Sequence, residues 1–316
     1  MKIAFVGASK FGLKCLNAVF HMGECEIVGS VTVPKKFSIS YQPEGVVNVL
    51  YADVESYCKE KKIPCLVMTK GMKDPILLDE VKSWQADIFL VVGWYHLIPK
   101  SWLDLAPAYG LHASLLPDYS GGAPLVWAII NGEKKTGITL FKFDKGVDNG
   151  PIVDQAETEI DDDDDIASLY SRIEELGLNL IIKNIPLIAR GEANLEIQKE
   201  SNRRIFPQRR PEDGLIDWKK SAKDLYNFIR AQTCPYPGAF TYFNGKVLKI
   251  WSASIPSPVN ICLESISIGQ IIPNTDKILI KTGDGILELL EVSYEDNNIH
   301  GKAIRKLLFE DGHLGR

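Results

Sequence analysis

The chain has 316 residues, of which 45% are hydrophobic and 24% are charged, and its formal net charge is −5. This length exceeds what one ordinary hydrophobic core serves, so two domains of a globular protein are expected. The acidic balance argues against a protein that binds nucleic acid mainly by electrostatics, because neutralising phosphates needs a surplus of cations.

The start of the chain predicts a strand directly after Met1, not a secretory signal, and no apolar run is long enough to span a membrane. The six cysteines include no C-x-x-C pair, which favours reduced structural thiols, and the five histidines lack the spacing of a metal site. We therefore expect a cytoplasmic protein without membrane contact or bound metal. A homo-oligomer is left open.

Short apolar runs alternate with helical segments in the first part of the chain. Strands are predicted at residues 2–7, 26–33, 64–68 and 86–94, and helices at 8–23, 54–62 and 74–84. Runs that are apolar on both faces and alternate with helices are typical of a parallel sheet covered on both sides. The expected fold class is α/β, with a doubly wound, Rossmann-like parallel sheet.

The first strand runs into "GASKFGLK", which invites a nucleotide-binding interpretation. Ser9 stands where the middle glycine of G-x-G-x-x-G belongs, and Lys14 lies one place too late for a phosphate-binding loop. A tight strand-to-helix turn is the preferred interpretation, so neither NAD nor ATP is implied.

Five aspartates at 161–165 precede a helix that is predicted to begin near Ile166 and to end at Pro186 or soon after. They suit the cap and first turn of that helix better than a calcium loop. Residues 190–215 are polar, basic and rich in proline, as in a linker.

An amphipathic helix and short strands follow the linker, with a hairpin turn at Asn244 and Gly245. They predict a small β-barrel, similar to an OB fold. The domains expected are 1–200, catalytic and Rossmann-like, and 201–316, the C-terminal β-barrel.

His112 is placed at the carboxyl end of a predicted strand, where open α/β sheets bind their ligands. The later stretch "TGITLFKFDKGVDNGPIV" is a strand followed by a loop in which glycines flank Asp148. A histidine and an aspartate on adjacent strand ends form a general acid–base pair. A core histidine is the competing interpretation.

The elements "LHASLLP", "GGAP" and "NGEKKTGITLFKFDKGVDNGPIV" resemble the folate-dependent formyltransferase family. Members transfer a formyl group from 10-formyltetrahydrofolate to an amine. The resemblance covers most of the chain, and the segments "RRPEDGLIDWKKSAKDLYNFIRA" and "PYPGAF" are most similar to members that act on UDP-4-amino-4-deoxy-L-arabinose. Initiator-tRNA formyltransferases share this part less closely.

The resemblance implies an Asn–His–Asp trio, in which the histidine is His112 and the aspartate is Asp148. The asparagine belongs two places before the histidine, where this chain has Gly110. His112 would donate to the oxyanion formed as the amine attacks, and Asp148 would orient the histidine and steer the proton. The missing amide would have been a second donor, and loss of one such donor costs about 10²–10³ in rate.

Three interpretations of Gly110 stay open. Another donor, such as Asn149 or a water, replaces the amide; the enzyme runs a slower or altered acyl transfer; or the protein binds without turnover. An active enzyme is preferred because His112, Ser114 and Asp148 are all present. On that view, Gly110→Asn leaves activity unchanged or raises it.

The resemblance also implies binding residues. Those expected to contact the folate are Val92, Gly93, Trp94, Tyr95, Leu97, Ile98 and Ser114. Those expected to contact the acceptor are Tyr119, Gly121, Gly122, Arg209 and Arg210, the two arginines because guanidinium groups suit phosphate. Core packing for the aromatic residues and a solvated linker for the arginines are the competing interpretations.

The acceptor expected is the amine of a nucleotide-linked amino sugar. Residues 33–45 carry only Lys35 and Lys36 as cations, too few for the phosphate contacts of a tRNA. The alternatives are methionyl-tRNA as acceptor, hydrolysis of the folate donor by water, and a formyltransferase-like binding protein.

Overall fold

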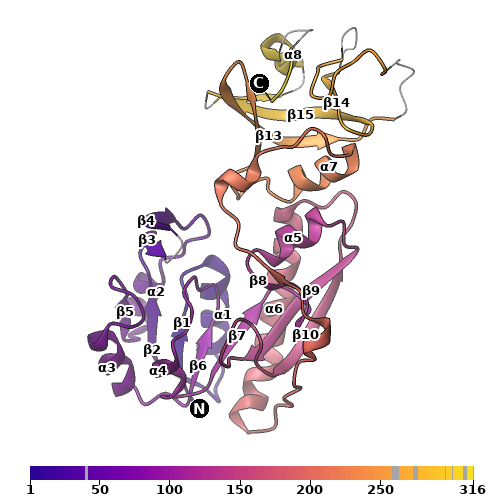
Figure 1. Ribbon diagram of the computed structural model, residues 1–316. Helices are drawn as coiled ribbons and strands as arrows, with labels where there is room; N and C mark the ends of the chain where they lie inside the picture. The colour runs from indigo at the N-terminus through magenta and orange to yellow at the C-terminus, as the bar shows by residue number, and fades with distance from the viewer. Residues whose placement is uncertain are drawn as a thin grey trace. The chain divides into compact units, whose positions relative to one another are not determined.

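The computed structural model describes every residue except 40, 41, 258–262, 273–276, 296, 301, 309–311 and 316. The chain divides into two compact units, which Figure 1 shows in ribbon form. The first contains Met1–Gly121, Thr136–Thr158 and Ser171–Ile205; the second contains Gly122–Lys135, Glu159–Tyr170 and Phe206–Arg316. The expected domain boundary between residues 200 and 201 stays a prediction.

A seven-stranded sheet forms the centre of the first unit, in the order β10-β9-β7-β6-β1-β2-β5. In that order its strands are Ile152–Glu159, Lys135–Lys142, Ala108–His112, Ile88–Val91, Lys2–Val6, Glu26–Thr32 and Cys65–Val67. The pairs β7–β6, β6–β1, β1–β2 and β2–β5 are parallel, which confirms the α/β fold class.

The β7–β9 pair departs from the expected all-parallel sheet, because β9 runs antiparallel to β7. Residues 122–135, with helix α5 (Pro124–Ile130), belong to the second unit. An antiparallel neighbour needs no helix to carry the chain back across the sheet, unlike a parallel one. The sheet is therefore mixed, and its antiparallel β7–β9 pair includes the strand that carries His112.

Helices α1 to α4 alternate with the parallel strands, at Lys10–Phe20, Val54–Lys61, Pro75–Ser83 and Lys100–Leu103. The turn before α1 is structural, because the Ser9 hydroxyl accepts from the Gly12 N–H at 3.0 Å and Ser9 is buried. A Cβ on Gly93 would lie 1.8 Å from that hydroxyl, so glycine is required there. This geometry supports the interpretation as a tight strand-to-helix turn.

The acidic run caps helix α6 (Ile166–Ala189), as expected. An Asp165 carboxylate oxygen accepts from the N–H groups of Ala167 and Ser168 at 2.8 and 2.9 Å. These groups have no partner within the helix, and the helix dipole favours a negative charge at this end.

The second unit contains a five-stranded antiparallel sheet, which confirms a small C-terminal β domain. Its strands β12 to β16 are Ala239–Phe243, Lys246–Ser254, Leu279–Lys281, Ile286–Tyr294 and Asn297–His300. The expected hairpin joins β12 to β13, and Asn244 and Gly245 have φ of 51° and 72°, the left-handed conformation that two-residue hairpin turns require. Helix α7 (Ala222–Arg230) contributes Leu225 and Ile229 to the core of this unit.

The remaining elements are short. They are the β3–β4 hairpin (Lys36–Ile39 and Gln42–Val47), the β8–β11 pair (Ser120–Gly121 and Ile205–Phe206) and helix α8 (Lys302–Leu308). The five described cysteines are free, and Cys262 lies outside the described residues. Within the described part of the chain, no helix has both the length and the apolarity to cross a membrane.

Candidate active site

Strand β7 brings His112 to the carboxyl end of the sheet. Ala108, Tyr109 and Gly110 are buried, whereas His112 is the last residue of the strand and its side chain is 11% exposed. His112 pairs with Thr139 of β9, and the buried Thr139 hydroxyl donates to the Ser114 carbonyl at 2.6 Å and accepts from the Leu116 N–H at 3.1 Å. Thr139 cannot be singled out from the sequence, because nothing in a β-strand pattern separates it from an ordinary core threonine.

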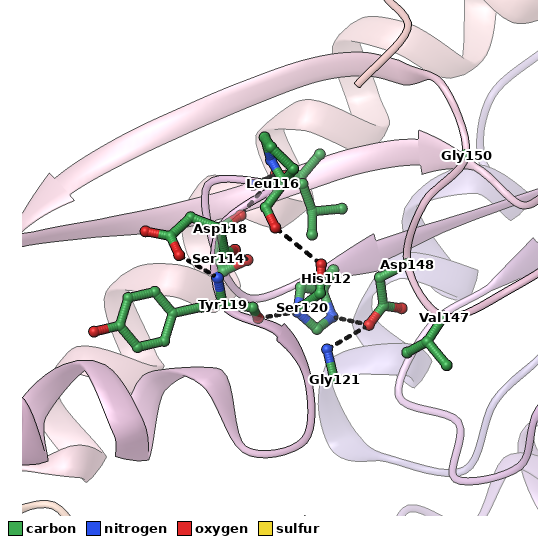
Figure 2. A network of polar contacts seen from close by, with 12 residues as sticks. His112, Ser114, Leu116, Asp118, Tyr119, Ser120, Gly121, Val147, Asp148 and Gly150 are labelled. Carbon is green, nitrogen blue, oxygen red and sulfur yellow. Dashed lines mark hydrogen bonds and ion pairs between the residues drawn. The ribbon is translucent and has the colours of Figure 1, made fainter. Parts of the chain in front are cut away.

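The imidazole of His112 and the carboxylate of Asp148 face each other, as Figure 2 shows. His112 Nδ1 lies 3.6 Å from Asp148 Oδ2, an ion-pair distance that is too long for a direct hydrogen bond. Nε2 lies 2.8 Å from the Tyr119 carbonyl, which only accepts, so Nε2 carries a proton. Asp148 Oδ2 also accepts from the Gly121 N–H at 2.8 Å. The end of β7 and the loop after β9 thus bring together an imidazole and a carboxylate, the groups that a general acid–base pair requires.

The loop after β9 adopts a demanding backbone conformation at Asp148, where φ is +51°. Gly146 has φ of +108°, and a Cβ on Gly150 would lie 1.7 Å from the Lys142 carbonyl oxygen. Glycine is therefore required on both sides of the aspartate. The carboxylate, which is 21% exposed, is presented to His112 by this bend.

At Gly110 the structure shows why the strand has no side chain. A Cβ there would lie 2.6 and 2.7 Å from the Phe143 ring and 2.7 Å from the Val91 carbonyl oxygen. Phe143 stacks on Phe141, with ring centroids 4.8 Å apart. Phe143 fills the space for an asparagine, which argues against the expectation that Gly110→Asn leaves activity unchanged or raises it.

Asn149 does not extend toward the imidazole. Its amide donates to the Lys145 carbonyl at 2.7 Å, within its own loop. A Cβ placed on Gly146 would meet that amide at 2.8 Å, so the side chain lies over the loop backbone. Replacement of the missing donor by Asn149 would require this side chain to rearrange.

The residues expected at the folate lie around the end of β6. Val92 is buried, Gly93 has φ of +62° and accepts from the Ala8 N–H, Leu97 is 77% exposed and Ile98 is half-buried. Trp94 donates to Met72 Sδ at 3.2 Å, and Tyr95 donates to the amide oxygen of the buried Asn48 at 2.7 Å. Ser114 is buried, and its hydroxyl donates to the Asp118 carbonyl at 2.7 Å. Their contact with a folate stays a prediction.

The residues expected at the acceptor separate into two groups. Tyr119 and Gly121 lie in the turn beside His112, with φ of +54° and +95°. The Tyr119 side chain is buried, and its contact with His112 is made by the backbone carbonyl. Gly122, Arg209 and Arg210 belong to the second unit, and a Cβ on Gly122 would lie 2.5 Å from the Gln208 backbone.

Arg209 is part of the packing of the second unit. Its guanidinium lies 4.8 Å from the ring centroid of Trp127 and 5.7 Å from that of Phe228. It donates to the Asp213 carbonyl at 2.6 Å and to the Gln232 side chain at 2.7 Å, and burial lowers the pKa of Arg209. A solvated linker arginine would make none of these contacts.

Arg209→Ala is therefore expected to lower the free energy of unfolding by about 1–3 kcal/mol, since it removes two hydrogen bonds and two aromatic contacts. Thermal denaturation measures this effect. The matched control is Arg210→Ala, because Arg210 is exposed and keeps its backbone hydrogen bond to Asp213. Equal melting temperatures for the two variants would contradict the packing role.

An α/β sheet with a histidine and an aspartate facing each other at the carboxyl ends of its strands is an arrangement typical of an α/β enzyme. The sequence profile described as "Formyl transferase" matches residues 1–185, and that described as "Formyl transferase, C-terminal domain" matches residues 209–303. The chain belongs to the formyl transferase family, whose members are folate-dependent transferases that use 10-formyltetrahydrofolate.

Full-length relatives agree with the family assignment. A methionyl-tRNA formyltransferase of Caldanaerobacter subterraneus subsp. tengcongensis is 32% identical over 95% of this chain and 94% of its own length. A methionyl-tRNA formyltransferase of Alkaliphilus oremlandii is 35% identical over 93% of this chain and 92% of its own length.

Solved structures share the fold at lower identity. An N-formyltransferase of Helicobacter canadensis, in complex with folinic acid and dTDP-3-aminofucose, is 20% identical with a TM-score of 0.63, over 92% of this chain and 98% of that chain. HypX from Aquifex aeolicus in complex with tetrahydrofolic acid is 16% identical with a TM-score of 0.62. The match covers 96% of this chain and 47% of the HypX chain.

Proposed function

We propose that this protein transfers the formyl group of 10-formyltetrahydrofolate to the amine of methionyl-tRNA, with His112 and Asp148 as the catalytic pair. The observation that carries the proposal is the placement of these two side chains, 3.6 Å apart, within the segment that matches the family. The names of the full-length relatives favour this acceptor over the amino sugar that the sequence motifs suggest.

The chemistry follows from the groups on the two loops. The acceptor amine attacks the formyl carbon, and the carbonyl oxygen becomes an oxyanion. Nε2–H of His112, which now donates to the Tyr119 carbonyl, turns to the oxyanion and stabilises it. The new C–N bond forms in this attack, and the bond between the formyl carbon and folate N10 breaks afterwards, when the oxyanion collapses to the carbonyl. The ammonium proton leaves toward the Asp148 carboxylate, and N10 gains a proton.

A second acceptor, the amine of a nucleotide-linked amino sugar, is favoured by the distribution of charge. The exposed cations of the β3 region are Lys35 and Lys36. In the second unit, Asp162 holds Lys134 at 3.0 Å and Lys223 at 3.1 Å, which occupies two further cations. Tight tRNA binding needs many cations free to meet phosphates, whereas a nucleotide sugar needs few.

Acceptor competition tests the proposal. Purified protein is incubated with 10-formyltetrahydrofolate alone, with initiator methionyl-tRNA, and with UDP-4-amino-4-deoxy-L-arabinose, and release of tetrahydrofolate is measured. We expect release only with the charged tRNA, with a kcat/KM that falls steeply as salt is raised.

Each other outcome identifies a different function. Release only with the sugar nucleotide establishes the second candidate, and release without any amine establishes a hydrolase. No release in any arm indicates a binding protein, which is then tested by equilibrium binding of tetrahydrofolate.

A further inference from the structure

We propose that the segment of residues 196–205, here called the connecting segment, holds both catalytic loops in place and sets the geometry of the His112–Asp148 pair. Its positioning residues are Gln198, Arg203 and Arg204. The proposal rests on the proposed function only in that it concerns the same pair. Sequence analysis assigned this stretch to a linker.

Gln198 and Arg203 hold the loop that carries Asp148. The buried amide of Gln198 donates to the carbonyls of Asp148 and Gly150 at 2.9 and 2.6 Å. Two carbonyl acceptors fix which end of the amide is nitrogen. The Arg203 side chain is 9% exposed, and its guanidinium donates to the Val147 carbonyl.

These contacts hold the loop backbone on both sides of Asp148, the residue in the left-handed conformation. Asp148 has φ of +51°, a conformation that a non-glycine residue adopts only when its surroundings impose it. At the start of the segment, Glu196 and Ile152 exchange backbone hydrogen bonds of 2.8 Å, which anchors it to β10. Release of Gln198 would let the loop relax and the carboxylate move away from the imidazole.

Arg204 holds the turn on the other side of the pair. Its guanidinium makes two hydrogen bonds to the Asp118 carboxylate, at 2.7 and 2.6 Å, and lies 4.7 Å from the Tyr119 ring centroid. Its carbonyl accepts from the Ser120 N–H at 3.0 Å. Tyr119, which also has positive φ, is thereby fixed with its carbonyl toward His112 Nε2.

Neighbouring residues of one segment thus reach both loops. Arg203 contacts the loop of Asp148, and Arg204 contacts the turn that orients His112. The Arg204–Asp118 pair is half-exposed, and such pairs add little to stability. The contact therefore fixes geometry more than it stabilises the fold, which separates a positioning role from a purely structural one.

The test compares Arg204→Gln and Gln198→Leu with the native protein in two measurements. The first is steady-state kinetics with the acceptor that supports turnover. The second is the ring ¹⁵N chemical shift of His112, in protein labelled at histidine and without substrate, with the resonance assigned by His112→Gln. We expect kcat to fall by about tenfold to a hundredfold, KM for the folate to change little, and the Nε2 signal to move.

Arg204→Lys keeps the charge but cannot make two parallel hydrogen bonds to the Asp118 carboxylate. It is expected to give intermediate values of kcat and of the Nε2 shift. The matched control is Arg190→Gln, because Arg190 is an exposed arginine of the same unit, paired with Glu192 at 2.9 Å and Glu24 at 3.2 Å. Its kcat and its His112 ¹⁵N shift are expected to equal those of the native protein. Asp118→Asn removes the same contact from the other side, and it replaces Arg204→Gln should that variant fail to fold.

A native His112 signal in both Arg204→Gln and Gln198→Leu overturns the proposal, whatever happens to kcat, because the segment would then act elsewhere. The ¹⁵N measurement needs neither donor nor acceptor. A protein that transfers no formyl group to any amine would refute the proposed function and leave this test intact.

Discussion

Asp148→Asn is expected to reduce kcat by about 10²–10⁴-fold, and His112→Gln by a similar factor, in release of tetrahydrofolate with the productive acceptor. Asparagine keeps an oxygen for the Gly121 N–H but loses the charge that faces His112 Nδ1 at 3.6 Å. Glutamine keeps an N–H donor but lacks the ring that faces Asp148 with one nitrogen and the Tyr119 carbonyl with the other. Both variants should melt close to the native temperature, because each replacement is similar in size and can still bond the backbone at the Tyr119 carbonyl or the Gly121 N–H.

Asp144→Asn is the control for this pair. Asp144 lies in the same loop, is exposed, and accepts from the Lys145 N–H, so its replacement makes the same change in charge without touching His112. It should keep near-native kcat. A near-native rate for Asp148→Asn would remove the aspartate from the chemistry.

Gly110→Asn is expected to destabilise the fold by about 1–3 kcal/mol and to lower activity, contrary to the view that it restores a missing catalytic amide. Any side chain at this position meets the Phe143 ring within 2.7 Å and the Val91 carbonyl oxygen at 2.7 Å. The ring packs against Phe141 and the buried cluster that includes Trp102, so it has little room to withdraw. Thermal melting and kcat measure the two effects.

The double variant Gly110→Asn/Phe143→Ala separates crowding from chemistry. Removing the ring opens space for the amide, so the double variant should be more stable than the sum of the two single changes predicts. It should also turn over faster than Phe143→Ala alone if an amide at this position donates to the oxyanion. Additive losses in stability would show that Phe143 and Gly110 are independent.

The packing of Phe143 against Gly110 bears on the three interpretations of the missing asparagine. A glycine whose space is filled by a stacked aromatic ring is a packed arrangement, unlike the void that loss of a side chain leaves. It is compatible with an active enzyme that lacks the amide, and with a binding protein. The kinetic tests above discriminate between the two.

The amino-acid sequence by itself determined the elements and the reactive residues. Strand and helix periodicity located the parallel part of the sheet, the capped helix at 166 and the Asn244–Gly245 hairpin, because each depends on residues close together in the chain. The motifs around His112 and Asp148 placed both residues at strand ends, where β7 and the loop after β9 bring them together.

Only the tertiary structure decided the reversed direction of β9, the filling of the Gly110 space by Phe143, and the role of the connecting segment. These depend on contacts between residues 27 or more positions apart, which leave no local periodicity. Gln198 and Arg204 lie in a polar, irregular stretch of sequence. Their proposed role depends on the backbone carbonyls and the carboxylate that they bond in the folded protein.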